Sequence, residues 1–542
     1  MIKKVLAFLS KVCLLGVILT VSSFGQFASA ANNKWKQDQF VISTFQGVSD
    51  ASRGFFVQVM STLKEANLTH VETAFTSPST SEQTCMIAEQ VGLKVIVMNY
   101  EMFGGFQNVY VPAKTEQEIR ASAEAAMQLY GKYKSLEGFY IWDEPYHTQF
   151  PLVRKVLDIF AEKFPDKLLF LGSQQSGSGG DIPYRLNPRP GTNEFSFTEY
   201  IDRWAQEVNP PLFVSNKAFF YDGVDKGLPL GQSEIWDNYG YLRNWALKKN
   251  VPMWYYVQLV GDPIQNQLGN NTIERVRMTV NSLLSYGVKG INYYTTYNTI
   301  VDYNGRKIGI FDDVKQLNAE TLKVGNEMLK FKSQLVYHTG DVNNHYDNKI
   351  TDSKIVRSAT DELIIGEFKS EKNQDYLYIT ARTYDRAYEG RVNLKNNYRV
   401  DVFNKSTGKY ELIGMNVGSI NLNYAAGGGN LYRILPKNTD VKEEPTTSAK
   451  STSPSSSKSS DGTTSNISAT SQQITSGDST AFSDPVSTDS VSSKTRSSEN
   501  ANEKPQSPGL LGWIIGGVTI LLAGGCTGFL FFLRKKKVTR ND

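Results

Sequence analysis

The middle of the chain alternates between two hydrophobic periods. Short apolar or aromatic runs recur from residue 40 to residue 298, and longer segments with apolar residues at helical spacing separate them. Glu116–Tyr133 and Thr272–Tyr286 are two such helical segments. The eight apolar runs are Phe40–Gly47, Thr69–Phe75, Lys94–Met102, Gly138–Pro145, Lys167–Gln174, Leu212–Asp222, Pro252–Gly261 and Gly290–Asn298.

Eight strand–helix alternations in about 260 residues predict an α/β fold, a (β/α)8 TIM barrel, because that barrel needs ~250 residues. The alternative is an open doubly wound sheet, which usually has a glycine-rich phosphate loop after its first strand. Phe45–Ser49 follows the first run and lacks that glycine pattern. We therefore assign residues 36–335 to a (β/α)8 barrel.

Period-two alternation replaces the helical pattern after the barrel. Five short strands separated by turn signals predict a small antiparallel β-sandwich over residues 345–437. The turn signals include Asn404–Gly408 and Ala425–Gly429, and a helix over Asn318–Phe331 joins the two domains. The predicted strands are Glu362–Phe368, Asp375–Thr383, Tyr398–Phe403, Tyr410–Met415 and Asn430–Leu435.

Both ends of the chain have the pattern of membrane targeting. Residues 1–30 combine lysines, an apolar run and Ala28-Ser29-Ala30, which predicts a secretory signal peptide. Residues 510–533 carry no charge and are followed by the basic tail 534–542, which predicts one transmembrane helix with a cytoplasmic tail. Between residues 441 and 500, half of the positions are Ser or Thr, so residues 438–508 are predicted to form a disordered stalk.

Charge and cysteine content exclude several classes of function. The net charge of +4 belongs to the two ends, so residues 31–533 are slightly acidic and do not predict a nucleic-acid partner. Cys85 is the one cysteine in the exported part, because Cys13 lies in the signal peptide and Cys526 in the membrane segment. With four histidines in all, no residues have metal-ligand spacing, and we predict neither a metal nor a cofactor.

Candidate chemistry lies at the end of the fourth predicted strand, because barrel active sites form at the carboxyl ends of the strands. This strand ends in Trp142-Asp143-Glu144-Pro145. If Glu144 points into the barrel mouth, strict alternation turns Trp142 and Tyr140 the same way. Asp143 would turn inward only where the strand ends.

These residues carry a family resemblance. Together with the stretch from Arg275 to Tyr294 and the closing Gly429–Ile434, Trp142–Pro145 resembles bacterial glycoside hydrolases that have a barrel followed by a β-sandwich. The resemblance implies that Glu144 is the general acid/base. It also implies a nucleophilic glutamate at the end of strand seven, where this chain has Gln258. The signal peptide, the scarcity of cysteine and the Ser/Thr-rich stalk together resemble Gram-positive surface proteins. We expect anchoring in the cell membrane through residues 510–533, with the large N-terminal part extracellular.

The missing strand-seven glutamate leaves three hypotheses open. The adjacent pair Asp143-Glu144 is similar to that of hexosaminidases that use the substrate's own 2-acetamido group, with Asp143 holding the acetamido nitrogen. Alternatively, Asp262, Asp222 or Glu101 supplies a second carboxylate, or the barrel is an inactive carbohydrate-binding adhesin. The expected partner is a glycan or glycoconjugate, and the predicted substrate-binding residues are Trp142, Tyr100, Glu101, Tyr256, Gln258 and Tyr294.

Overall fold

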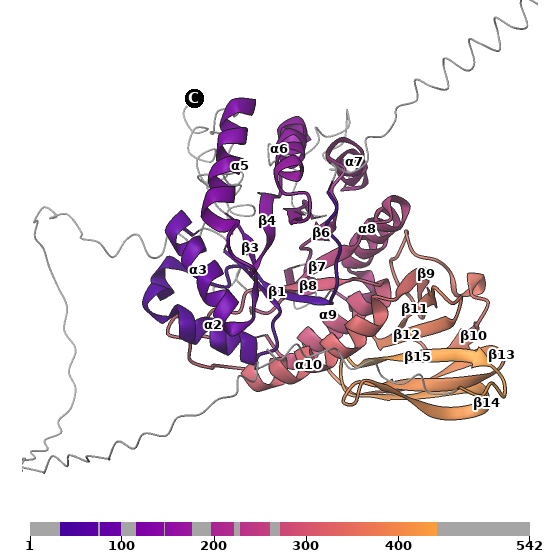
Figure 1. Ribbon diagram of the computed structural model, residues 1–542. Helices are drawn as coiled ribbons and strands as arrows, with labels where there is room; N and C mark the ends of the chain where they lie inside the picture. Colours follow the sequence, from indigo (N-terminus) through magenta and orange to yellow (C-terminus); the bar gives the residue numbers. More distant parts are fainter. Residues whose placement is uncertain are drawn as a thin grey trace, which may run out of the picture. The chain divides into compact units, whose positions relative to one another are not determined.

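The structure is a computed structural model that describes residues 33–73, 76–98, 115–145, 147–175, 197–221, 228–260 and 271–441 (Figure 1). The predicted signal peptide, membrane segment and tail, and nearly all of the predicted stalk, lie outside these residues. In the described ranges, no helix combines the length and the apolar character that crossing a membrane requires.

Eight parallel strands form the first domain. They make two four-stranded sheets, β2-β3-β4-β5 and β6-β7-β8-β1. The amide of Thr69 donates to the carbonyl of Ile42 at 2.9 Å, and that of Ser173 to the carbonyl of Val214 at 3.0 Å, so both seams are joined into a TIM-barrel-like ring. Each of the eight predicted runs overlaps one strand, and only β4 begins before its run, which starts at Gly138. The strands are β1 Val41–Thr44, β2 His70–Glu72, β3 Lys94–Val97, β4 Leu136–Asp143, β5 Leu168–Gly172, β6 Phe213–Ser215, β7 Met253–Gln258 and β8 Gly290–Tyr294.

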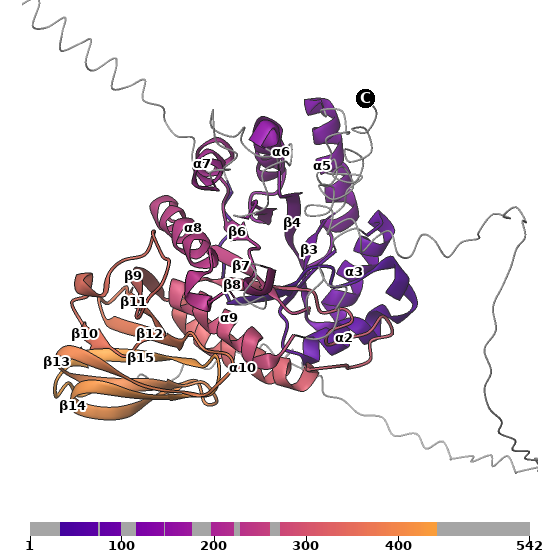
Figure 2. The same ribbon diagram turned by 180° about the vertical axis from the view of Figure 1, so that it is seen from behind.

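Amphipathic helices surround these strands (Figure 2). Thr115 caps the beginning of α5, where its side chain accepts a hydrogen bond from the amide of Glu118. Gly287, with φ 82°, caps the end of α9. The helices are α2 Phe56–Glu65, α3 Pro78–Val91, α5 Glu116–Tyr130, α6 Phe150–Lys163, α7 Phe197–Arg203, α8 Ile235–Lys249, α9 Ile273–Tyr286 and α10 Phe311–Met328. The short helical turns are η1 Asp50–Phe55, η2 His147–Gln149, η3 Trp204–Val208, η4 Phe219–Tyr221, η6 Leu230–Gln232 and η7 Ile350–Asp352.

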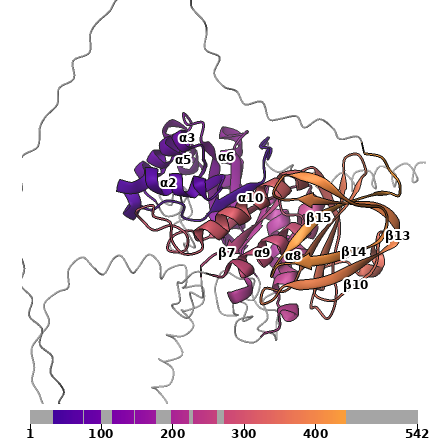
Figure 3. The same cartoon turned by 90° about the horizontal axis from the view of Figure 1, so that it is seen from below.

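A seven-stranded antiparallel sheet follows α10 (Figure 3). Its first strand, β9, begins at Phe331, so the sheet starts before the predicted boundary at 345. The five predicted strands are present, and the turn at Asn404–Gly408 joins two of them, whereas β9 and β10 lie outside the predicted strands. The strands are β9 Phe331–His338, β10 Val356–Ala359, β11 Leu363–Ser370, β12 Asp375–Ala381, β13 Tyr388–Asn404, β14 Lys409–Tyr424 and β15 Gly429–Pro436.

One face of this sheet packs on α9, and the other encloses a second apolar core. Tyr378 of β12 donates to Asn281 Oδ1 of α9 at 2.6 Å, and the hydroxyls of Thr380 and Ser285 lie 2.8 Å apart. A side chain at Gly366 would meet the Ser285 carbonyl oxygen at 2.1 Å, so β11 requires glycine at this approach. The sheet therefore buttresses the barrel through α9.

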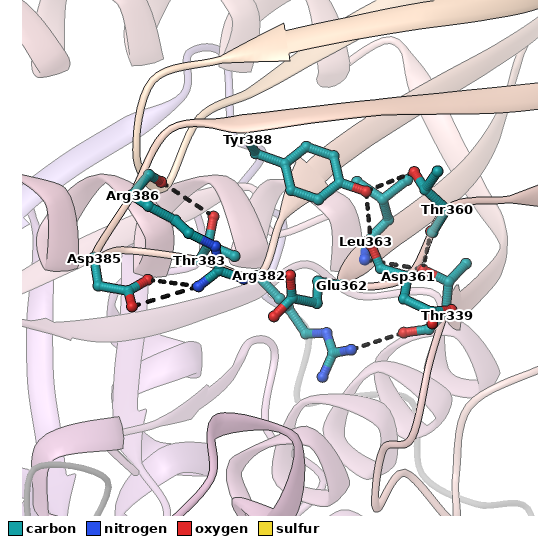
Figure 4. A network of polar contacts seen from close by, with 10 residues as sticks. All are labelled: Thr339, Thr360, Asp361, Glu362, Leu363, Arg382, Thr383, Asp385, Arg386 and Tyr388. Carbon is teal, nitrogen blue, oxygen red and sulfur yellow. Dashed lines mark hydrogen bonds and ion pairs between the residues drawn. The ribbon is translucent and has the colours of Figure 1, made fainter.

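Polar contacts fasten the loops at one end of the sheet (Figure 4). The Tyr388 hydroxyl lies 2.7 Å from Thr360 Oγ1 and donates to the Asp361 carbonyl at 2.6 Å. Arg382 is buried, which lowers its pKa to about 10, and it donates to the Thr339 carbonyl at 2.7 Å. These contacts satisfy backbone carbonyls of the connecting loops, and we assign the network a structural role.

Candidate active site

A bulge in β4 determines which side chains enter the barrel. Tyr140 pairs with Phe170 of β5, but the next pair is Trp142 with Leu171, so one extra residue lies on β4. Tyr140 consequently belongs to the apolar cluster inside the barrel, whereas Trp142 packs in the larger core that includes the helices. The predicted inward direction of Trp142 is therefore wrong, because the extra residue reverses the alternation.

The same bulge brings Asp143 inside the barrel. The Tyr140 hydroxyl donates to Asp143 Oδ1 at 2.6 Å, although the two residues are three apart in one strand. Asp143 pairs with Gly172 of β5, where a side chain would come within 2.7 Å of Asp143 Oδ1. Burial and, secondly, the charge of Glu144 raise the pKa of Asp143 to about 8, while the Tyr140 hydrogen bond lowers it.

Glu144 follows β4 in a left-handed conformation, with φ 43°. Its amide donates to the Gly172 carbonyl at 3.0 Å, and its carbonyl accepts from Gln174 Nε2 at 2.7 Å, so both neighbouring backbone groups are fixed by the β5 end. Its carboxylate accepts from Asn216 Nδ2, just after β6, at 2.5 Å. A non-glycine residue at positive φ costs on the order of 1 kcal/mol, and such strain is concentrated at functional sites.

Glu72 at the end of β2 is a third acid, which sequence reasoning missed. It is fully buried, and its carboxyl accepts from the Tyr256 hydroxyl at 3.0 Å and from Ser43 Oγ at 3.3 Å. Burial raises the pKa of Glu72 to about 8; the two hydrogen bonds lower it and the charge of Asp143 raises it. The available signal is an isolated acid within the apolar run Thr69–Phe75.

Three predicted substrate-binding residues lie at the ends of β7 and β8. Tyr256 is buried inside the barrel, where its hydroxyl contacts Glu72 directly and lies 3.4 Å from that of Tyr140, the tyrosine that contacts Asp143. Tyr294 packs on Phe45, with ring centroids 5.7 Å apart, and burial, followed by the charges of Asp143 and Glu144, raises its pKa to about 12. Gln258 pairs with Tyr294 in the sheet and is buried.

The remaining predicted residues lie outside the described ranges. They are Tyr100, Glu101, Asp222 and Asp262, so their relation to Asp143 and Glu144 stays a prediction. Among the residues that the structure describes, no three His, Cys, Asp or Glu side chains gather as a metal site. The described site is therefore an acid cluster built from β2 and β4 and completed by tyrosines and amides of β6, β7 and β8.

Comparison with known proteins gives distant structural likenesses. No family model matches the chain, and no curated protein matches it. Solved structures that match include an Anoxybacillus alpha-amylase, at 11% identity, covering 74% of this chain and 99% of that one, with a TM-score of 0.40. A family 5 glycoside hydrolase from Bacteroides vulgatus matches at 11% identity, covering 74% and 89%, with a TM-score of 0.45. A GH27 β-L-arabinopyranosidase from Geobacillus stearothermophilus matches at 10% identity, covering 77% and 99%, with a TM-score of 0.42.

Proposed function

We propose that the barrel is a glycoside hydrolase in which Glu144 is the general acid/base and Asp143 assists it. The observation that carries this proposal is the β4 bulge, which turns Asp143 into the barrel directly before Glu144. Two carboxyl groups in different surroundings are what glycoside hydrolysis requires, one to donate a proton and one to stabilise positive charge on the sugar. Asn216, which donates to Glu144, fixes the direction of the acid.

The surroundings of Glu72 favour a substrate-assisted mechanism over one that uses Glu72 as nucleophile. Glu72 is fully buried, and both of its oxygens are hydrogen-bonded to residues of the barrel interior. A nucleophile must instead reach the anomeric carbon, which places its carboxyl group about 5–5.5 Å from that of the acid/base. A 2-acetamido oxygen of the substrate would attack that carbon while Glu144 gives its proton to the leaving oxygen. Asp143 would accept the acetamido N–H, and Glu144 would then take a proton from the attacking water.

Paired reporter substrates test this mechanism. We expect turnover of N-acetylhexosaminides and none of the corresponding plain hexosides. Glu144→Gln should lower the rate on substrates with poor leaving groups by roughly 10²–10⁴-fold, the usual contribution of general acid catalysis. Glu137→Gln is the matched control, because Glu137 is on the same strand and accepts from Trp35 Nε1 at 2.6 Å, a bond that glutamine can still accept.

The other outcomes identify the competing hypotheses. Efficient cleavage of plain hexosides would reject the substrate-assisted mechanism. Glu101, Asp222 and Asp262 would then be the candidates for the second catalytic carboxylate. Binding of glycans without cleavage of any reporter would identify an adhesin. An unchanged rate in Glu144→Gln would exclude Glu144 as the acid.

We also propose that the protein is displayed on a bacterial cell surface by its C-terminal apolar segment. The support is the pattern of the two chain ends, a leader at 1–30 and an uncharged segment at 510–533 followed by basic residues. Deletion of residues 510–542 should release the protein into the culture medium. Retention of the truncated chain in the membrane fraction would reject this anchor.

A further inference from the structure

Glu72 and Asp143 are connected through two tyrosine hydroxyls. Tyr256 lies 3.0 Å from Glu72 Oε2 and 3.4 Å from the Tyr140 hydroxyl, and Tyr140 lies 2.6 Å from Asp143 Oδ1. All four side chains are buried. Three consecutive hydrogen-bond contacts therefore join two carboxyl groups that come from different strands, β2 and β4.

The number of hydrogens available to these four side chains limits their total charge. Each phenol supplies one hydrogen, so the two tyrosines can donate only two of the three hydrogen bonds. When all three contacts are hydrogen bonds, the third hydrogen comes from a protonated carboxyl at one end. If Glu72 is protonated, it donates to Tyr256, Tyr256 donates to Tyr140, and Tyr140 donates to ionised Asp143. If Asp143 is protonated, all three bonds reverse and Glu72 carries the charge.

We propose that Glu72 and Asp143 hold one proton in common through Tyr256 and Tyr140, which makes Glu72 a positioning residue for Asp143. Moving the proton requires three coupled transfers, from Glu72 to Tyr256, from Tyr256 to Tyr140 and from Tyr140 to Asp143. No atom is gained or lost, and the negative charge moves from Asp143 to Glu72.

The consequence for catalysis rests on the proposed function. While Glu144 holds its proton, the charge can stay on Asp143, where it would accept the substrate N–H. Once Glu144 has given its proton away, two adjacent negative charges would repel each other in a buried site. The tyrosine chain allows the charge of Asp143 to move to Glu72 instead, away from Glu144.

The groups facing Glu72 disfavour a second negative charge on the pair. Tyr256 of β7 contacts Glu72, Tyr140 of β4 contacts Tyr256, and Asp143 acts on Glu72 through its charge. Ser43 of β1 donates to Glu72 and is uncharged. Burial raises the pKa of both acids to about 8, so full ionisation of the pair is unfavourable at neutral pH.

Infrared spectroscopy of the full-length protein without substrate tests the shared proton, because a protonated carboxyl group has a characteristic C=O band. At pH 7 the pair should contribute one such band. Both Glu72→Gln and Asp143→Asn should remove this band. In each variant the introduced amide donates a hydrogen bond to its tyrosine, so the remaining acid stays ionised. Glu367→Gln is the control, since Glu367 is a buried acid of the separate sheet that accepts from the Tyr337 hydroxyl at 2.9 Å; this variant should leave the band of the pair unchanged.

The result that overturns the proposal is loss of the band in only one of the two amide variants, or in neither. That result would mean that one acid holds the proton independently. If either amide variant does not fold, Tyr256→Phe carries the test, because it interrupts the chain and retains both acids. It should move the titration midpoint of the band by about one pH unit, the size expected for separating coupled groups; an unmoved midpoint rejects the chain.

This measurement is independent of the proposed reaction. If no substrate is hydrolysed but both amide variants lose the carboxyl band, the proposed hydrolase function is rejected and the shared proton is supported. If hydrolysis depends on Glu144 but only one amide variant, or neither, loses the band, the hydrolase function is supported and the shared proton is rejected. If the protein is a hydrolase and the proton is shared, Tyr256→Phe should shift the pH profile of kcat/KM by a similar amount. Glu72→Gln should then retain more activity than Glu72→Ala.

Discussion

Removing the carboxyl of Glu72 should change how the stability of the protein depends on pH. In the unfolded chain this group titrates near its ordinary pKa of 4.5, whereas burial raises the pKa to about 8 in the folded protein. Between these values the folded protein retains a proton that the unfolded chain releases. The contribution of Glu72 to stability is therefore fully present below pH 4.5 and is lost as the pH rises toward 8.

The size of the effect follows from proton linkage. One proton of difference changes the free energy of unfolding by about 1.4 kcal/mol per pH unit, so wild type should lose ~2.7 kcal/mol from this site between pH 5 and pH 7. Glu72→Gln has no proton to retain. The difference in unfolding free energy, variant minus wild type, should therefore become more positive by about that amount over the same range.

Denaturant unfolding of both proteins at pH 5, 6 and 7 measures this difference. Glu65→Gln is a useful control, because Glu65 is a surface acid whose pKa is lowered by its hydrogen bonds to Lys307 and Lys315. The contribution of an acid with a lowered pKa is lost only as the pH falls below its unfolded value, so this variant should give a flat difference between pH 5 and 7. A flat difference for Glu72→Gln as well would show that Glu72 ionises normally in the folded protein.

Two glycine substitutions should separate the site from the sheet that supports it. Gly172→Ala places a methyl group 2.7 Å from Asp143 Oδ1, so we expect at least a tenfold loss of hydrolysis while thermal unfolding shows that the fold is retained. Gly366→Ala places a methyl group 2.1 Å from the Ser285 carbonyl oxygen and should destabilise the protein by roughly 1–3 kcal/mol, measured by denaturant unfolding, through overpacking between β11 and α9. Full activity in Gly172→Ala, or unchanged stability in Gly366→Ala, would contradict these packing arguments.

The barrel strands were predictable because each is an apolar run long enough to stand out between amphipathic helices. The predicted run Lys167–Gln174, for example, contains β5 at Leu168–Gly172, and all five strand residues are buried. β10 was not predictable in the same way, because only the first of its four residues is buried. A short edge strand of this kind is defined by its pairing with β13, which is a tertiary property.

The candidate site was predictable only in part, for a similar reason. The acids of Trp142–Pro145 are visible as a pair at a strand end, but the bulge that directs Asp143 inward is visible only in the pairing of β4 with β5. Strict alternation placed Trp142 on the wrong side because it counts residues on one strand alone. Glu72 was missed because a single acid in an apolar run acquires meaning only when Tyr256 and Tyr140 are placed beside it.

The polar interior of the barrel is itself an argument for function. Barrel interiors of this kind are usually filled by branched apolar side chains. Here Ser43 of β1 and Tyr256 of β7 pair with the same β8 residue, Asn292, and Glu72 contacts both, so a polar layer crosses the middle of the barrel. Apolar residues would fill this space without the free-energy cost of burying a carboxyl group. Tyr140 connects this layer to Asp143, whose pKa is raised by burial and by the charge of Glu144 and lowered by the Tyr140 hydrogen bond, so the layer reaches the candidate acid through one tyrosine.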